Sequence, residues 1–164
     1  MGELFSGSGL ETVDAAGRVR PPRFVRDTLA RRSDSRAAML GVHERDACLT
    51  GFDPGYARIL HAELERRRLR DEENGVGADA HHDRARRAFG LTEEAHLDDR
   101  GAIVLPRLTR NRGRIGRLAL FVGTGGAFEI WNPELAREAG GEELRALAEY
   151  WLSARTSNVR EEGE

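Results

Sequence analysis

Arginine is the residue type in this chain best suited to chemistry, because all 26 basic Lys or Arg residues are Arg and many of them cluster. A planar guanidinium can pair at two points with a phosphate or with a guanine edge. The first cluster places six arginines against two aspartates in residues 14–32. It predicts contacts to phosphates and base edges, or else a solvated basic face. Its basic members are Arg18, Arg20, Arg23, Arg26, Arg31 and Arg32.

A second cluster lies at residues 107–117 and contains no acid. Its members are Arg107, Arg110, Arg112, Arg114 and Arg117. It predicts either a second set of phosphate contacts or ion pairs with an acidic C-terminal helix, within one subunit or between subunits. The acids of that helix are Glu134, Glu138, Glu142 and Glu143.

Patterns for metal binding and for catalysis are weaker. The five histidines and Cys48 make no H-x-x-x-H, H-x-H or C-x-x-C spacing, which favours scattered surface histidines and no metal. Cys48 and His43 could approach on a strand pair, but no orienting group or oxyanion hole accompanies them. Residues 123–126 (G-T-G-G) lack the Lys-Ser/Thr ending of a P-loop. We therefore expect no enzyme activity, no cofactor and no small-molecule substrate.

The two arginine clusters lie in the two copies of an internal sequence repeat. Residues 13–24 (V-D-A-A-G-R-V-R-P-P-R-F) align with residues 97–108 (L-D-D-R-G-A-I-V-L-P-R-L) at a constant offset of 84. Residues 52–54 (F-D-P) align with residues 131–133 (W-N-P) at an offset of 79, so one loop of the second copy is five residues shorter. The repeat pairs Asp14 with Asp98, Gly17 with Gly101, and Pro22 with Pro106.

Each copy predicts two short strands joined by a turn, then a helix, then two further strands. Asp starts turns and Gly supplies positive φ, so Asp14 and Gly17 are assigned mainly to the turn. Pro22 and Pro106 are expected where a helix begins. Asp53 and the aligned Asn132 should cap the helices that follow each copy. The further strands are expected at 37–42, 47–52, 118–122 and 127–131.

These elements divide the chain into five segments. Two β-rich repeats are separated by a helical connector and followed by a C-terminal helix and a flexible polar tail. The connector should hold two helices around an exposed loop at 71–79. The segments are 4–54 (first repeat), 55–90 (connector), 91–133 (second repeat), 134–155 (helix) and 156–164 (tail).

Composition limits the class of protein. With 164 residues, of which 39% are hydrophobic, the core is small and would gain from burial against a partner. The aromatics Phe121, Phe128 and Trp131 lie on this thin core and favour assembly. A net charge of −2 argues against a uniformly basic coat, though not against a local patch. A lone cysteine, no signal-like N-terminus and no stretch of ~18 apolar residues predict a cytoplasmic protein without membrane contact.

The motifs and their order resemble the MraZ family. The resemblance rests on F-x-G (Phe5, Gly7), on V-D-A-A-G-R at 13–18, on L-D-D-R-G-A-I-V-L-P at 97–106 and on L-F-V-G-T-G-G-A-F-E-I-W-N at 120–132. It covers roughly residues 4–152. It implies an α+β fold of two tandem SpoVT/AbrB-like repeats of the swapped-hairpin type, which form a pseudo-dimer within one chain.

The family pattern D-x-x-x-R is kept unequally in the two halves. The first half has it as Asp14 and Arg18, whereas the second half has Asp98 but Ala102 in place of Arg. Arg100 lies nearby and could substitute in part. Two further departures are Ala16, where the family usually has Lys, and Pro21, where it has an apolar residue.

What the resemblance implies is a sequence-specific DNA-binding repressor of the division and cell-wall gene cluster. It would act at the nucleoid as a ring-shaped homo-oligomer on short direct repeats in double-stranded promoter DNA. The residues carried over are Arg18, Arg20 and Arg23 with Asp14 and Gly17, and as secondary contacts Arg100, Arg107, Arg110 and Arg112.

A scaffold or interaction protein is the alternative. Such a protein would have kept the ring and lost specific DNA binding. The replacements Ala16, Pro21 and Ala102 and the net charge of −2 favour it.

Overall fold

The main body of the protein is an antiparallel six-stranded sheet with helices, which confirms the α+β class. The computed structural model describes residues 3–162. The strand order is β1-β7-β8-β4-β3-β5. The strands are β1 (Ser8–Thr12), β3 (Ala37–Val42), β4 (Leu49–Phe52), β5 (Glu93–His96), β7 (Leu118–Gly123) and β8 (Phe128–Trp131).

Strands from the two expected repeats are interleaved in this sheet. β1 pairs with β7, and β4 pairs with β8, so segments from both expected repeats share one hydrogen-bonded surface. A separate two-stranded sheet joins β2 (Arg18–Val19) to β6 (Ile103–Val104), again one strand from each segment. We call this pair of strands the ribbon.

The core lies where the two segments meet. Val19 and Ile103 of the ribbon belong to the same buried cluster as Phe121 and Phe128 of the main sheet. Phe121, Phe128 and Trp131 are 0%, 0% and 4% exposed, so the expectation that they favour assembly is wrong. The physical reason is that the interleaved strands of one chain already cover them.

Two helices begin directly after prolines, as predicted. α1 (Arg23–Arg32) follows Pro22 and α4 (Arg107–Arg112) follows Pro106. Proline fixes φ near −65° and lacks an N–H, which costs nothing at a helix start. Both helices therefore begin next to the ribbon, in equivalent places of the two segments.

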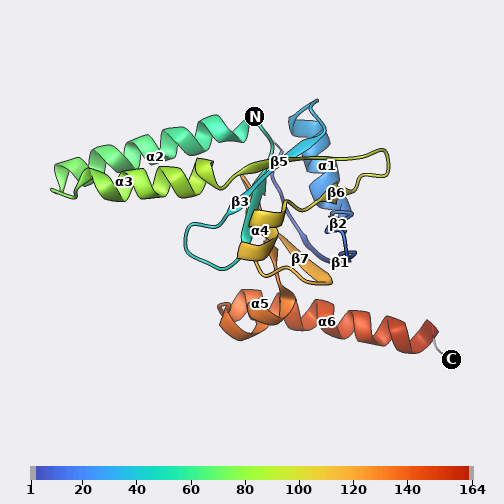
Figure 1. The fold of residues 1–164 in the computed structure, drawn as a ribbon. Helices are drawn as coiled ribbons and strands as arrows, with labels where there is room; N and C mark the ends of the chain where they lie inside the picture. The colour runs from blue at the N-terminus through green and yellow to red at the C-terminus, as the bar shows by residue number, and fades with distance from the viewer. Residues whose placement is uncertain (1–2, 163–164) are drawn as a thin grey trace.

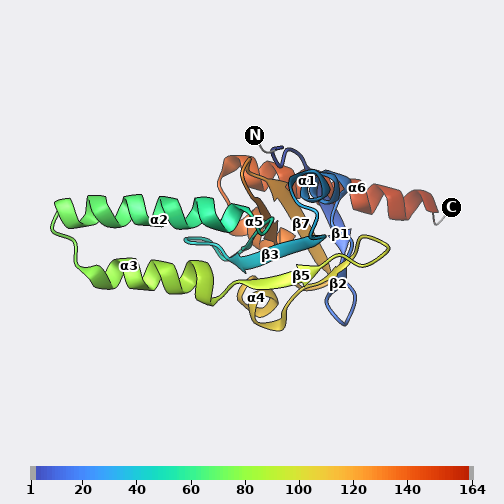
Figure 2. The same ribbon diagram turned by 90° about the horizontal axis from the view of Figure 1, so that it is seen from above.

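The connector forms a helical arm that projects away from the sheet (Figures 1 and 2). It consists of α2 (Tyr56–Glu73), α3 (Ala78–Ala85) and a π-helical turn, η1 (Arg86–Gly90). The break at 74–77 is shorter than the predicted loop at 71–79. α2 continues through Glu73 because residues 71–73 are compatible with a helix. It ends where Gly75 adopts a φ of 74°.

The expected C-terminal helix at 134–155 is two helices. α5 (Pro133–Ala139) and α6 (Glu142–Glu162) are separated by Gly140 and Gly141, since glycine disfavours a continuous helix. α6 extends over most of the expected tail, because no Gly or Pro interrupts residues 142–162; residues 163–164 lie outside the described part. No helix within residues 3–162 is both long and apolar enough to cross a membrane.

The two expected helix caps behave differently. Asn132 accepts hydrogen bonds from the backbone N–H groups of Glu134 and Leu135, as a cap should. Asp53 does not cap α2, whose first flanking residue is Gly55. Its carboxylate lies 3.0 Å from Arg32 Nε instead, and both side chains are buried. The stronger attraction of the guanidinium explains why the aspartate turns away from the helix.

Candidate nucleic-acid interface

Two aspartate turns hold the ribbon in place. Asp14 Oδ1 accepts from the backbone N–H groups of Ala16 and Arg18, each at 2.9 Å. Asp98 Oδ1 accepts from those of Arg100 and Ala102, also at 2.9 Å. The two aligned segments thus build the same turn from the same residue type, and each turn leads into one strand of the ribbon.

A glycine with positive φ completes each turn. Gly17 has a φ of 88° and Gly101 a φ of 77°, which other residues adopt only with strain. The Gly17 carbonyl also accepts from the Leu105 N–H at 2.9 Å, which ties the first turn to the second strand. The assignment of Asp14 and Gly17 to the turn therefore agrees with the structure.

Arg18 lies at the centre of the ribbon. Its guanidinium forms an ion pair with Asp98 of the opposite turn, and about half of its side chain is exposed. Across the ribbon it faces Val104, whereas its neighbour Val19 faces Ile103. Arg18 and Val104 are exposed and Val19 and Ile103 are buried, so the ribbon has one outward and one inward face.

The other predicted contacts are arranged unequally. Arg20 lies directly after β2 and donates from Nε to the Arg100 carbonyl at 2.8 Å, which joins the end of β2 to the second turn. The Arg23 side chain is 85% exposed, and its Nε lies 3.2 Å from Asp27 Oδ2, one turn along α1. Two other members of the first cluster serve the fold: Arg26 Nε donates to the Pro21 carbonyl, and Arg32 packs against Asp53. Arg31 is mostly exposed and lies 3.9 Å from Glu3.

The second cluster is only partly available to a ligand. Arg107 and Arg112 are exposed on α4. Arg110 is half-buried, because it donates to the carbonyls of Ile115 (3.1 Å) and Gly116 (3.4 Å). Among side chains of residues 3–158, no arginine of 107–117 forms an ion pair with the acidic residues of α5 and α6. Pairing within one chain, one of the two expected roles, is therefore not seen there.

One possible metal-ligand set is assembled by strand pairing. His43, Cys48 and Glu129 place their ligand atoms within 4.8 Å of one another, although their sequence spacing gives no such pattern. Spacing could not reveal the set because Glu129 comes from β8, in the other segment.

Hydrogen bonds in this set fit a structural role better than a metal. His43 Nδ1 accepts from the N–H groups of Arg45 (3.2 Å) and Asp46 (3.1 Å), so the imidazole proton belongs on Nε2, 3.3 Å from Glu129. The other oxygen of Glu129 accepts from Trp131. Burial, with the negative charges of Glu129 and Asp46, raises the pKa of Cys48 far above its usual range, which leaves an unreactive thiol.

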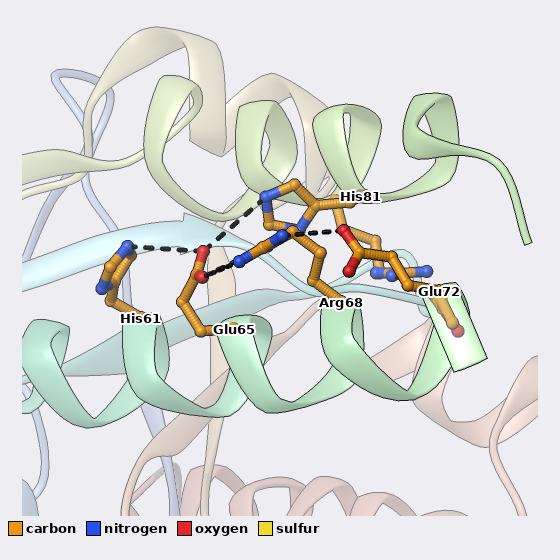
Figure 3. A network of polar contacts seen from close by, with 7 residues as sticks. His61, Glu65, Arg68, Glu72 and His81 are labelled. Carbon is orange, nitrogen blue, oxygen red and sulfur yellow. Dashed lines mark hydrogen bonds and ion pairs between the residues drawn. The ribbon is translucent and has the colours of Figure 1, made fainter.

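Charged and titratable side chains in the arm connect α2 to α3 (Figure 3). Glu65 lies at the centre, with Arg68 at 2.9 Å and with His61 and His81 at 3.9 Å. His81 comes from α3 and the others from α2. The hydrogen bond from Arg68 lowers the pKa of Glu65, so the carboxylate stays charged. This network stabilises the helical pair and does not resemble a binding site.

Comparison with known proteins gives one consistent family. No family model matches the chain. The chain is similar to proteins named "Transcriptional regulator MraZ" from Saccharophagus degradans (28% identity, covering 86% of this chain and 94% of that protein), Nitrosococcus oceani (29%, 89% and 93%) and Gluconobacter oxydans (29%, 88% and 87%). Each match extends over nearly the whole of both chains. These similarities support membership of the MraZ family, as a diverged member.

Proposed function

We propose that this protein is a transcriptional regulator that binds double-stranded promoter DNA through its ribbon. The similar proteins are named transcriptional regulators, which supports the regulatory role. Arg18 would be the principal contact, and Arg20 and Arg23 would contact phosphates. The turns of Asp14 and Asp98 would hold these side chains in position.

The observation that carries the proposal is the shape of the ribbon. Two antiparallel strands with a buried inner face present Arg18 and Val104 outward, next to the exposed start of α1. A two-stranded ribbon fits the major groove, where Arg pairs with guanine and apolar groups contact the thymine methyl. Arg107 and Arg112 add positive charge on the equivalent helix of the second repeat.

The rest of the function is proposed with it. The protein would act as a ring of identical subunits, in the cytoplasm and at the nucleoid, and repress the division and cell-wall gene cluster. A single ribbon with a few arginines binds weakly. Neighbouring subunits on spaced direct repeats would gain by effective concentration.

A scaffold without specific DNA binding is the second candidate. One observation favours it: Arg18 is already paired with Asp98, so DNA must compete with that carboxylate. Ala102, which aligns with Arg18, is 8% exposed and offers no charge. The second repeat therefore presents fewer basic groups on the ribbon than the first.

A titration across salt concentrations separates the two candidates. The full chain is titrated against DNA from its own upstream region and against scrambled DNA of equal length. Arg18→Ala should nearly abolish operator preference, because a guanine contact contributes ~1–3 kcal/mol and a ring repeats it. Arg23→Ala should weaken binding to both DNAs alike. It should also lower the salt slope, the slope of log affinity against log salt concentration, by ~1.

The matched control is Arg58→Ala, which removes an exposed charge from α2 in the arm. This variant should bind like the parent. If Arg18→Ala keeps the parent's operator preference, the ribbon is not the reading element and the scaffold becomes the better candidate.

A further inference from the structure

Four arginines line one pocket beside the ribbon, and we call it the arginine pocket. Arg20, Arg26, Arg36 and Arg100 contribute to its wall, Leu29 and Leu97 are apolar lining residues, and its volume is about 310 Å³. That volume is at the lower end of the range for small-ligand sites, about 300–1,000 Å³. The residues come from the two segments, so the pocket exists only in the folded chain.

Three of these guanidiniums are fixed by backbone carbonyls. Arg20 donates to Arg100 at 2.8 Å, Arg26 to Pro21 at 3.0 Å and Arg36 to Asp98 at 2.9 Å. Each bond uses one of five N–H donors. The three side chains make no other hydrogen bond to residues 3–158, so their remaining donors are held in place without a protein acceptor. Such preorganised donors reduce the cost of binding an anion.

The positive charge of the pocket is poorly balanced. Among residues 3–158, no carboxylate lies within ion-pair distance of any of the four arginines. Asp99 is the one acid in the wall. Glu11 lies outside it but close enough for Arg26 and Arg20 to favour its charged form, although burial still raises the pKa of Glu11. Clustered guanidiniums that outnumber the nearby carboxylates are an arrangement that phosphates occupy.

The turn at Gly101 makes the pocket possible. A Cβ atom at Gly101 would lie 3.0 Å from Arg26 Cδ, so the absent side chain lets α1 place its arginine under the second turn. The second turn thus has two uses: it leads into the ribbon and it forms one side of the pocket.

We infer that the arginine pocket is a binding site for a phosphate group. Two sources have this chemistry: a free phosphorylated compound, or a backbone phosphate of the DNA held by the ribbon. The second source rests on the proposed function, and the first does not.

Calorimetry with inorganic pyrophosphate tests the free source on the full chain without DNA, at constant ionic strength. One pyrophosphate per chain should bind. The double variant Arg26→Gln/Arg36→Gln should lose at least about tenfold in affinity, since each change removes a charged donor. Arg58→Gln, which removes an equal charge from the arm, should bind as the parent does.

Two milder variants keep the test valid if the double variant unfolds. Arg100→Gln removes a side chain with no hydrogen bond to residues 3–158, so the fold should persist while pyrophosphate binding weakens. Asp99→Asn removes the opposing charge, and it should tighten pyrophosphate binding by up to about fivefold. If Asp99→Asn leaves the affinity for pyrophosphate unchanged, pyrophosphate does not bind beside Asp99 and the pocket is not its site.

DNA binding tests the other source. If the parent does not bind pyrophosphate, but Arg26→Gln/Arg36→Gln lowers the salt slope for DNA by ~1 and Arg58→Gln does not, the occupant is a backbone phosphate. If neither pyrophosphate binding nor the salt slope depends on the pocket arginines, the inference is overturned. A parent that binds pyrophosphate but no DNA would contradict the proposed function alone.

Discussion

Asp98 makes two kinds of contact at once. One carboxylate oxygen accepts from two backbone N–H groups of its own turn, and the other pairs with Arg18 of the first repeat. Asp14 shares the first role but has no arginine at the aligned position, because Ala102 stands there. Asp98 is therefore the residue that connects the two turns.

Replacing Asp98 should cost stability more than DNA affinity. Asp98→Ala removes two backbone acceptor bonds and the ion pair, so unfolding in urea should become easier by about 1–3 kcal/mol. Asp34→Ala, which changes an exposed aspartate, is the matched control. A variant that folds normally but no longer binds operator DNA would instead identify the second repeat as a DNA reader.

Residue types predicted the turns but not their partners. Asp14 and Gly17 were readable as a turn because the local chain geometry demands those residue types. The ion pair of Arg18 with Asp98 joins residues 80 apart in the chain, and the bond from Arg36 to the Asp98 carbonyl joins residues 62 apart. Local sequence carries no signal for such contacts, so Arg36 was not among the predicted site residues.

At the scale of elements, Arg32 connects four parts of the fold. It lies at the end of α1, pairs with Asp53 before α2, and donates to the Gly126 carbonyl in the β7–β8 turn at 2.8 Å. Its guanidinium also lies over the rings of Phe5 and Tyr56, at 4.9 and 5.4 Å from their centroids. A buried charge with this many partners is held in one geometry.

A double-mutant cycle should show strong coupling in this pair. Asp53→Ala or Arg32→Met alone leaves a buried charge without its partner and should cost about 3–5 kcal/mol. The double variant should cost less than the sum of the two, by about 0.5–3 kcal/mol. The free energy of unfolding in urea is measured for the parent, the two single variants and the double variant. If the two single effects simply add, the two side chains act independently.

Strand and helix positions were largely predictable, whereas capping was not. The strand at Ala37–Val42 follows from its apolar run, and Pro22 and Pro106 marked two helix starts. Asp53 and Asn132 have the same local pattern, yet only Asn132 caps its helix. The difference comes from Arg32, a residue from another element that local pattern rules do not consider.

At the scale of the whole molecule, surfaces away from the core are the candidates for assembly. Ile59 and Leu69 on the arm and Tyr150 on α6 are each more than half exposed. The arm and α6 extend from the sheet body in different directions (Figure 1). These groups replace the buried aromatics as the apolar surface that a neighbouring subunit could cover.

We expect a closed homo-oligomer larger than a dimer. Subunits joined through two different surfaces form a ring when the rotation closes. Light scattering on the full chain at micromolar concentration should give a mass of at least three times the chain mass of 18.2 kDa. A stable species of 18.2 kDa under those conditions would contradict both the ring and the multivalent part of the proposed function.

The interleaving of strands has a consequence during synthesis. β1 ends at Thr12, but its partner β7 begins at Leu118, so a ribosome adding about 5–20 residues each second releases the first repeat seconds before that partner exists. Among the described strand pairings, the β3–β4 hairpin is the one that closes within the first repeat. Meanwhile the edges of β1 and β4 are open to the second repeat of another nascent chain. The first repeat must therefore keep these edges unpaired until the second repeat of its own chain has been synthesised.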